Sequence, residues 1–221
     1  MNDKTKMGDK EWAKFAVLGG VGFVILNVIG SIVQGSPPKA NDSGEKVLAW
    51  FADKESGIRL AGFLGALSII LLLWWFGTLW RRMAEAETNQ NRLSVLSLIG
   101  LTGSGALFAA SAAITSTVAL RLDEIPAAEA KFFYTLAGVL LSMAGAFVVV
   151  HLLATNVLAL RTTFLPKGIA LFGLLPAAAF VVSTSGAMSD GDLPMIAGFV
   201  GYITWMLWIL ATSFQMWKTA D

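Results

Sequence analysis

Six long apolar stretches are separated by short polar segments along the chain. They cover residues 15–34, 60–80, 93–120, 132–158, 168–188 and 194–217. None contains Asp, Glu, Lys or Arg, and each reaches the roughly 20 mainly apolar residues that a helix needs to cross about 30 Å of hydrocarbon. Apolar and polar residues do not alternate at every second position, as they do in the strands of a membrane β-barrel. The pattern therefore predicts an all-α polytopic membrane protein, a single domain over residues 1–221, with six transmembrane helices.

Residues 35–59 form the longest connection between two of these stretches. Pro37 and Pro38 end the first helix, and Asn41–Glu45 has the residue types of a new helix start with acids in its first turn. Apolar and charged side chains then mix as in a short amphipathic helix that lies at the membrane interface. Such a helix either caps the outer end of the bundle or forms a lid or a docking surface for a partner, and the sequence leaves these alternatives open.

Composition agrees with a chain that lives in a lipid bilayer. Apolar residues make up 56% of the sequence, charged residues 14%, and the mean hydropathy is +0.68, whereas a soluble domain has about 25% charged residues. The net charge of +1 gives no basic surface for nucleic acid. With no Cys and a single His, one chain offers no zinc or thiolate site, so we expect neither a metal nor a cofactor.

The distribution of basic residues predicts the orientation of the chain. Lys and Arg are more frequent in the two terminal tails and in residues 81–92 and 159–167 than in the other connections. Because positively charged loops stay on the cytoplasmic side, we expect both termini to be cytoplasmic.

The lack of charge within the six stretches limits the function. Ion pathways, proton relays and voltage sensors need ionisable groups inside the membrane, and the only side chain there that titrates near neutral pH is His151. We expect His151 to face the bundle interior and to hydrogen-bond to a neighbouring helix. The alternative is a polar contact to a substrate, together with Asn156. Haem ligation would need a second axial ligand.

An intramembrane serine hydrolase is the most remote of the alternatives. The segment Thr102–Gly105 is similar to the GxSG motif of rhomboid-type proteases, but it has Thr in the first position. The depths of Ser104 and His151 in the membrane are similar enough for a Ser–His pair, although depth alone does not establish contact.

Small residues recur at four-residue spacing on two of the predicted helices. The positions are Gly105, Ala109 and Ala113 on one helix, and Gly138, Ser142 and Ala146 on another. Such a spacing lets helices approach closely. It favours a non-enzymatic protein that acts by helix packing, with a partner membrane protein or with identical subunits.

Polar and aromatic residues within the spans support an alternative. Asn27, Ser104, Tyr202, Trp205 and Trp208 lie within the apolar stretches, and Pro176 predicts a kink in the fifth helix. Aromatic walls with a few polar groups suit a small hydrophobic ligand. The chain would then be a binder or uncoupled facilitator of a small neutral or hydrophobic molecule such as a lipid, a quinone or a sterol.

Two short motifs carry a resemblance to a known group. One is Trp80-Arg81-Arg82 at the end of the second helix, and the other is Leu165-Pro166-Lys167-Gly168 at the start of the fifth. With the long first connection, they make the chain similar to uncharacterised bacterial six-helix membrane proteins known only as a domain of unknown function. The resemblance covers most of the chain and implies a six-helix fold in the bacterial cytoplasmic membrane, but it implies no activity.

Overall fold

The computed structural model describes residues 3–87, 91–189 and 191–219, with side chains described for residues 14 and 15 and from residue 17 onward. These residues form helices and no strand. The helices are α1 (Asp3–Gln34), α2 (Gly44–Asp53), α3 (Glu55–Glu87), α4 (Arg92–Leu120), α5 (Ala127–Thr162), α6 (Lys167–Phe172), α7 (Leu174–Ser183), the 3₁₀-helix η1 (Thr184–Ala187) and α8 (Asp192–Lys218).

Six of the helical segments are long and apolar enough to cross a membrane. They are Val17–Gln34, α3, α4, α5, Lys167–Ala187 and α8. The prediction of an all-α polytopic membrane protein is therefore confirmed, and the chain is an integral membrane protein. Several helices extend beyond the predicted spans, α3 as far as Glu87 and α5 as far as Thr162, because hydropathy marks only the part of a helix in hydrocarbon.

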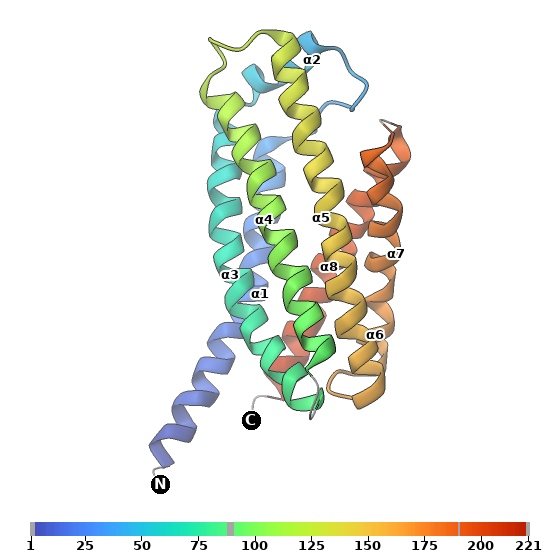
Figure 1. Ribbon diagram of the computed structural model, residues 1–221. Coiled ribbons are helices and arrows are strands. Elements are labelled where there is room, and N and C mark those ends of the chain that lie inside the picture. The colour runs from blue at the N-terminus through green and yellow to red at the C-terminus, as the bar shows by residue number, and fades with distance from the viewer. Residues whose placement is uncertain (1–2, 88–90, 190, 220–221) are drawn as a thin grey trace.

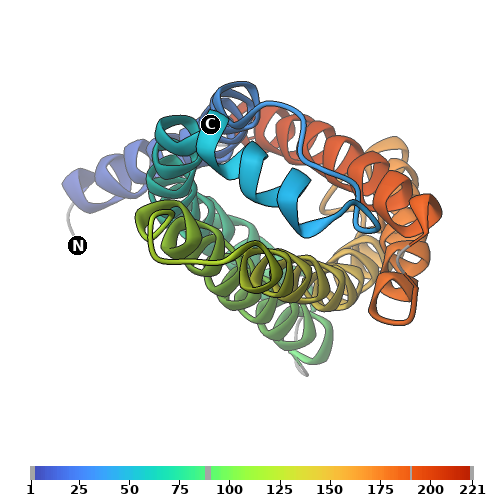
Figure 2. The same ribbon diagram turned by 90° about the horizontal axis from the view of Figure 1, so that it is seen from above.

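The six spans form a closed ring (Figure 2). Going around it, α1 packs on α3, α3 on α4, α4 on α5, α5 on α7, α7 on α8, and α8 returns to α1. Both termini lie at the same end of this ring (Figure 1), which we call the inner end, and α2 lies at the opposite, outer end. The shared side of the termini agrees with an even number of spans, whereas their cytoplasmic location stays a prediction.

The short helix predicted between the first two spans is present as α2. Ser43 caps its N-terminus, and its hydroxyl accepts a hydrogen bond of 3.3 Å from the backbone N–H of Lys46. One face of α2 buries Val47 and Phe51 against a small cluster that includes Ile58 and Val118. Hydrophobic burial thus holds α2 across the outer ends of α3, α4 and α5.

The fifth span, in which Pro176 predicts a kink, is divided into two helices. Helix α6 ends at Phe172 and α7 begins at Leu174, so the break falls at Gly173. Pro176 lacks an N–H, and its ring clashes with the carbonyl four residues earlier, which belongs to Phe172. The break therefore lies one turn before the proline.

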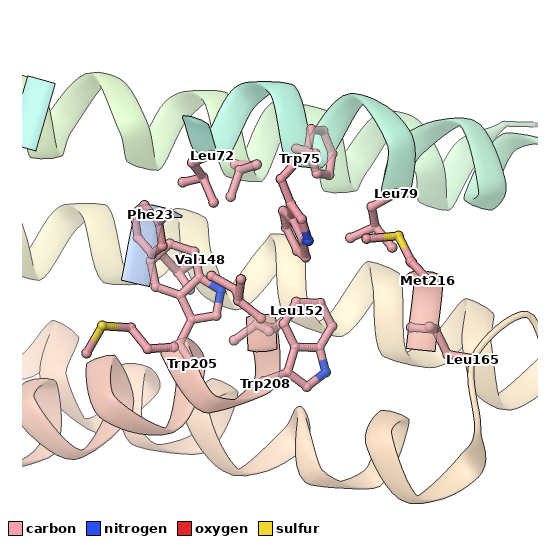
Figure 3. Close-up of a cluster of buried hydrophobic side chains, with 14 of the residues drawn as sticks. Phe23, Leu72, Trp75, Leu79, Val148, Leu152, Leu165, Trp205, Trp208 and Met216 are labelled. Carbon is pink, nitrogen blue, oxygen red and sulfur yellow. The ribbon is translucent and has the colours of Figure 1, made fainter. Parts of the chain in front are cut away.

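Large side chains fill the inner half of the ring (Figure 3). Trp75, Trp208, Leu79 and Met216 are all fully buried there. Trp75 and Trp208 meet edge to face, with ring centroids 6.2 Å apart. This cluster closes the inner half of the bundle.

Candidate functional site

The outer half of the ring contains a partly open cavity of about 1220 Å³. Residues from all six spans line it, and so does the segment between α1 and α2. Pockets for drug-sized ligands measure about 300–1,000 Å³ and are mostly apolar. The cavity is therefore large enough for a substantial hydrophobic molecule.

Small residues make the room for this cavity. Gly65 on α3, Gly105 on α4 and Gly138 on α5 line it, and a Cβ atom added at any of the three would meet no atom within 4 Å. Of the positions predicted for helix packing, Gly105, Ala109, Ala113, Gly138 and Ser142 line the cavity, whereas Ala146 does not. Their role in packing against a partner or an identical subunit stays a prediction.

Aromatic side chains form the floor of the cavity, toward the inner half. Phe23, Phe108, Phe180 and Trp205 line it. The rings of Phe108 and Trp205 stack at 12° with centroids 6.3 Å apart, and Phe23 meets Trp205 edge to face at 5.7 Å. Figure 3 shows Trp205 within the buried core cluster, together with Trp208. The cavity is thus closed toward the inner end.

One polar pair stands at the depth of the floor. The Tyr202 hydroxyl donates a hydrogen bond of 2.5 Å to Asn27 Oδ1, and Asn27 Nδ2 donates one of 2.8 Å to the Phe23 carbonyl. Tyr202 and Asn27 both line the cavity. Because each makes a protein hydrogen bond, they can stand next to an apolar ligand at little cost.

Residues 35–43, which we call the strap, lie at the outer end of the cavity. Pro37 and Ala40 of the strap line it. The Tyr134 hydroxyl of α5 donates a hydrogen bond to the Pro38 carbonyl, and Lys39 Nζ lies 3.0 Å from Asp192 Oδ2 at the start of α8. The strap is therefore attached on two sides of the ring.

Asp42 fixes the shape of the strap. Its carboxylate accepts hydrogen bonds of 2.8 Å from the Lys46 ammonium and 2.8 Å from the backbone N–H of Lys39. The Lys46 hydrogen bond first, and the Lys39 N–H second, lower the pKa of Asp42 below its usual 3.8. The carboxylate thus stays ionised and keeps the strap joined to α2.

His151 lies in the inner core, outside the cavity. Its Nδ1 is 2.8 Å from Ser97 Oγ on α4, and Ser97 Oγ is 3.0 Å from Thr155 Oγ1. Phe76 and Trp208 meet the imidazole edge to face. The predicted hydrogen bond of His151 to a neighbouring helix is thus confirmed, and no Asp, Glu, Lys or Arg is among the buried side chains that the structure describes.

The remaining predicted residues also lie outside the cavity. Ser104 is buried, and its hydroxyl donates to the Leu101 carbonyl of its own helix at 2.8 Å. It is Ser97 that lies against His151, so the pair expected for a hydrolase is not formed. Asn156 donates to the Leu152 carbonyl at 2.8 Å, and Trp208 belongs to the core.

The structure thus divides the seven residues predicted for ligand binding. Asn27, Tyr202 and Trp205 line one cavity, whereas His151, Asn156, Ser104 and Trp208 lie in the packed core or within α4. The floor residues Phe23, Phe108 and Phe180 were not predicted. For Phe108 alone the sequence carries a signal, its position one turn after Gly105 on a face that continues with Ala112 and Thr115.

Comparison with known proteins identifies a protein family but no activity. A family model described as a domain of unknown function, DUF4386, matches residues 16–212. The resemblance to an uncharacterised domain of unknown function is thereby confirmed. No curated protein and no solved structure matches the chain.

Proposed function

The chain belongs to the DUF4386 family, and for this member of a family without an assigned function we propose the binding of a small hydrophobic molecule in the cavity of the outer half. The observation that carries the proposal is the cavity itself, about 1220 Å³ lined mainly by apolar residues. An apolar cavity left empty forfeits the dispersion contacts of its lining, and an apolar molecule that enters restores them. A hydrophobic ligand therefore has a physical reason to enter.

The chemistry of the lining supports a neutral or mainly apolar ligand. Inside the ring, the polar pair Tyr202 and Asn27 is already hydrogen-bonded within the protein. Several hydroxyls of the lining, such as those of Ser68, Ser111 and Thr115, also donate to backbone carbonyls already. A ligand with many polar groups would therefore lose more hydration there than the remaining donors and acceptors replace. A mainly hydrocarbon molecule meets no such penalty.

The packed inner half of the ring favours binding of a molecule in the cavity over its uncoupled passage to the inner end. Trp205 forms the floor of the cavity, Trp75 and Trp208 are buried beneath it, and all three belong to the same core cluster. A molecule in the cavity would have to displace this cluster to reach the inner end, and tightly packed cores resist such displacement. We therefore place binding before facilitated passage.

Two glycines on α3 allow a matched test. Gly65 lines the cavity and Gly77 does not, yet a Cβ at either position meets no atom within 4 Å. G65L places a leucine side chain inside the cavity, whereas G77L adds the same side chain to the same helix elsewhere. Native mass spectrometry of protein purified in a gentle detergent should show a hydrophobic molecule retained by wild type and G77L and retained to a smaller extent by G65L. Equal retention by G65L and G77L would contradict the proposal, and so would wild type without a retained molecule.

A further inference from the structure

Helices α1 and α8 pack closely in their inner halves. A Cβ atom added at Gly20 of α1 would lie 2.5 Å from Ser213 Oγ of α8. Farther out, the hydrogen bond between Asn27 and Tyr202 joins the two helices. Beyond this bond, residues of both helices line the cavity.

The exposure of one face of α8 changes at the level where α1 and α8 separate. Met195, Tyr202, Met206, Ile209 and Ser213 recur at helical spacing and share this face. Inward of Tyr202 the face is covered, and Met206 is only 5% exposed. Outward of Tyr202 it is uncovered, since Met195 is 44% exposed and the adjoining Phe199 67%. Met195 and Phe199 also line the cavity, so this part of the wall is open.

The burial of the α1 face that lies toward α8 changes at the same level. Gly20 and Val24 are buried where they face α8, whereas Ser31, about one turn beyond Asn27, is exposed and lines the cavity. Figure 2 shows α8 diverging from α1 toward the outer end, with the segment after α1 running across to the beginning of α8. The cavity therefore opens sideways between the outer halves of α1 and α8, beneath the strap.

This lateral opening lies at the depth of the lipid tails. Phe199 is seven residues after Asp192, which corresponds to about 10 Å along the helix at 1.5 Å per residue. The hydrocarbon core is about 30 Å thick, so a position this far from the end of the span faces acyl chains. Water-soluble molecules do not reach this position in quantity, whereas lipid tails are the solvent there.

We infer that the cavity takes up acyl chains of a bilayer lipid, which enter sideways between α1 and α8 while the headgroup stays at the outer surface beside the strap. The inference rests on the proposed function and names its ligand class and its route of entry. The chains run from the exposed Phe199 toward the aromatic floor at Phe108 and Trp205. The ion pair between Lys39 and Asp192 joins the strap to α8 above them.

A photoreactive phospholipid tests the route. The full chain is reconstituted in phosphatidylcholine vesicles that contain a phospholipid with a diazirine at the end of one acyl chain, and labelled residues are mapped by mass spectrometry. In wild type we expect labelling of the floor at Phe108 or Trp205, besides labelling of the bilayer-facing Ile203. The Ile203 signal reports successful reconstitution in every variant.

Paired tryptophan substitutions block the opening or leave it free. S31W/M195W fills the opening from both helices at exposed positions. I32W/I196W is the matched control, because Ile32 and Ile196 are exposed neighbours on the same helices and do not line the cavity. We expect floor labelling to be lost in S31W/M195W and kept in I32W/I196W. Equal floor labelling in the two double variants overturns the lateral route.

A headgroup-free probe separates this inference from the proposed function. A short alkyl diazirine is small enough to reach the cavity without a lipid tail. Floor labelling of wild type by this probe but not by the phospholipid overturns the lipid inference and leaves the binding of small hydrophobic molecules standing. Absence of floor labelling by both probes overturns the two proposals together.

Discussion

The hydroxyl of Tyr202 donates a hydrogen bond to Asn27, and this bond marks the level at which α8 and α1 part. Inward of it, the two helices pack closely at Gly20 and Ser213. Outward of it, Ser31 and Met195 line the cavity and are exposed. One interhelical contact thus separates the packed half of the ring from the hollow half.

Removing this hydrogen bond should destabilise the ring by about 1 kcal/mol. Y202F leaves the Asn27 oxygen without its donor, and interhelical hydrogen bonds in membranes average about 0.6 and reach about 1.7 kcal/mol. The control is T204V, because the Thr204 hydroxyl donates only within α8, to the Val200 carbonyl at 2.7 Å among others. Unfolding in mixed micelles of increasing SDS content measures both. Equal midpoints for Y202F and T204V would show that the bond does not stabilise the ring.

Two glycines on α4 should respond in opposite directions to alanine. A Cβ at Gly100 would lie 2.6 Å from the His151 backbone N and 2.7 Å from the Phe147 carbonyl oxygen, whereas a Cβ at Gly105 meets nothing within 4 Å. Backbone atoms cannot rotate away, so G100A forces α4 and α5 apart, at about 1–3 kcal/mol. G105A should be neutral or stabilise by up to about 1 kcal/mol through helix propensity. The same SDS titration measures the stability of both variants. Equal effects of G100A and G105A would contradict the close packing of Gly100 against α5.

Gly100 and Gly105 show which features of the fold the sequence predicts and which it does not. Hydropathy predicts the six spans because a helix that crosses a bilayer needs about 20 consecutive, mainly apolar residues, and such a run is visible in the sequence itself. Four-residue spacing finds small residues such as Gly105 but does not say whether a small residue faces another helix or a cavity. Gly100 touches α5, yet no spacing rule selected it. Whether a small residue faces a helix or the cavity depends on which helices are neighbours around the ring. One of these pairs, α1 and α8, is formed by parts of the chain that are distant in sequence.

The same reasoning applies to the predicted binding residues. His151 was correctly placed inside the bundle because an ionisable group avoids lipid. Its partner Ser97 could not be chosen over Ser104, since both are buried serines on α4. Nothing local in the sequence tells that Tyr202 lines a cavity while Trp208 belongs to the core.

Those two serines give a third prediction. Ser97 bonds with both His151 and Thr155, so S97A leaves a buried imidazole nitrogen without its partner and should cost about 1–3 kcal/mol. S104A removes a buried hydroxyl that bonds only to the Leu101 carbonyl of its own helix, and should cost less. Thermal unfolding in detergent compares the two. A smaller effect of S97A than of S104A would contradict the role given to Ser97.

The strap should loosen in acid. Hydrogen bonds from Lys46 and from the backbone of Lys39 lower the pKa of Asp42 from its usual 3.8. A carboxyl with a lowered pKa in the folded state adds stability above its unfolded pKa, and this stability is lost as the pH falls through the folded pKa. We expect hydrogen exchange of residues 35–43, corrected for its intrinsic pH dependence, to be protected at pH 5 to 7 and to lose protection below about pH 4. D42N should show the weaker protection throughout, and a wild-type profile in D42N would refute the assignment.

The ion pair between Lys39 and Asp192 should hold the strap without contributing to global stability. Both side chains are about half exposed, and exposed pairs are worth about 0–1 kcal/mol. K39D or D192K places like charges together, so exchange of the strap amides should rise by up to about fivefold at low salt. K39D/D192K restores the pair with opposite polarity and should restore protection. R121Q is the control, because Arg121 pairs with Glu124 in another connection. If the double variant exchanges as fast as the single ones, the attachment of the strap to α8 does not depend on this pair.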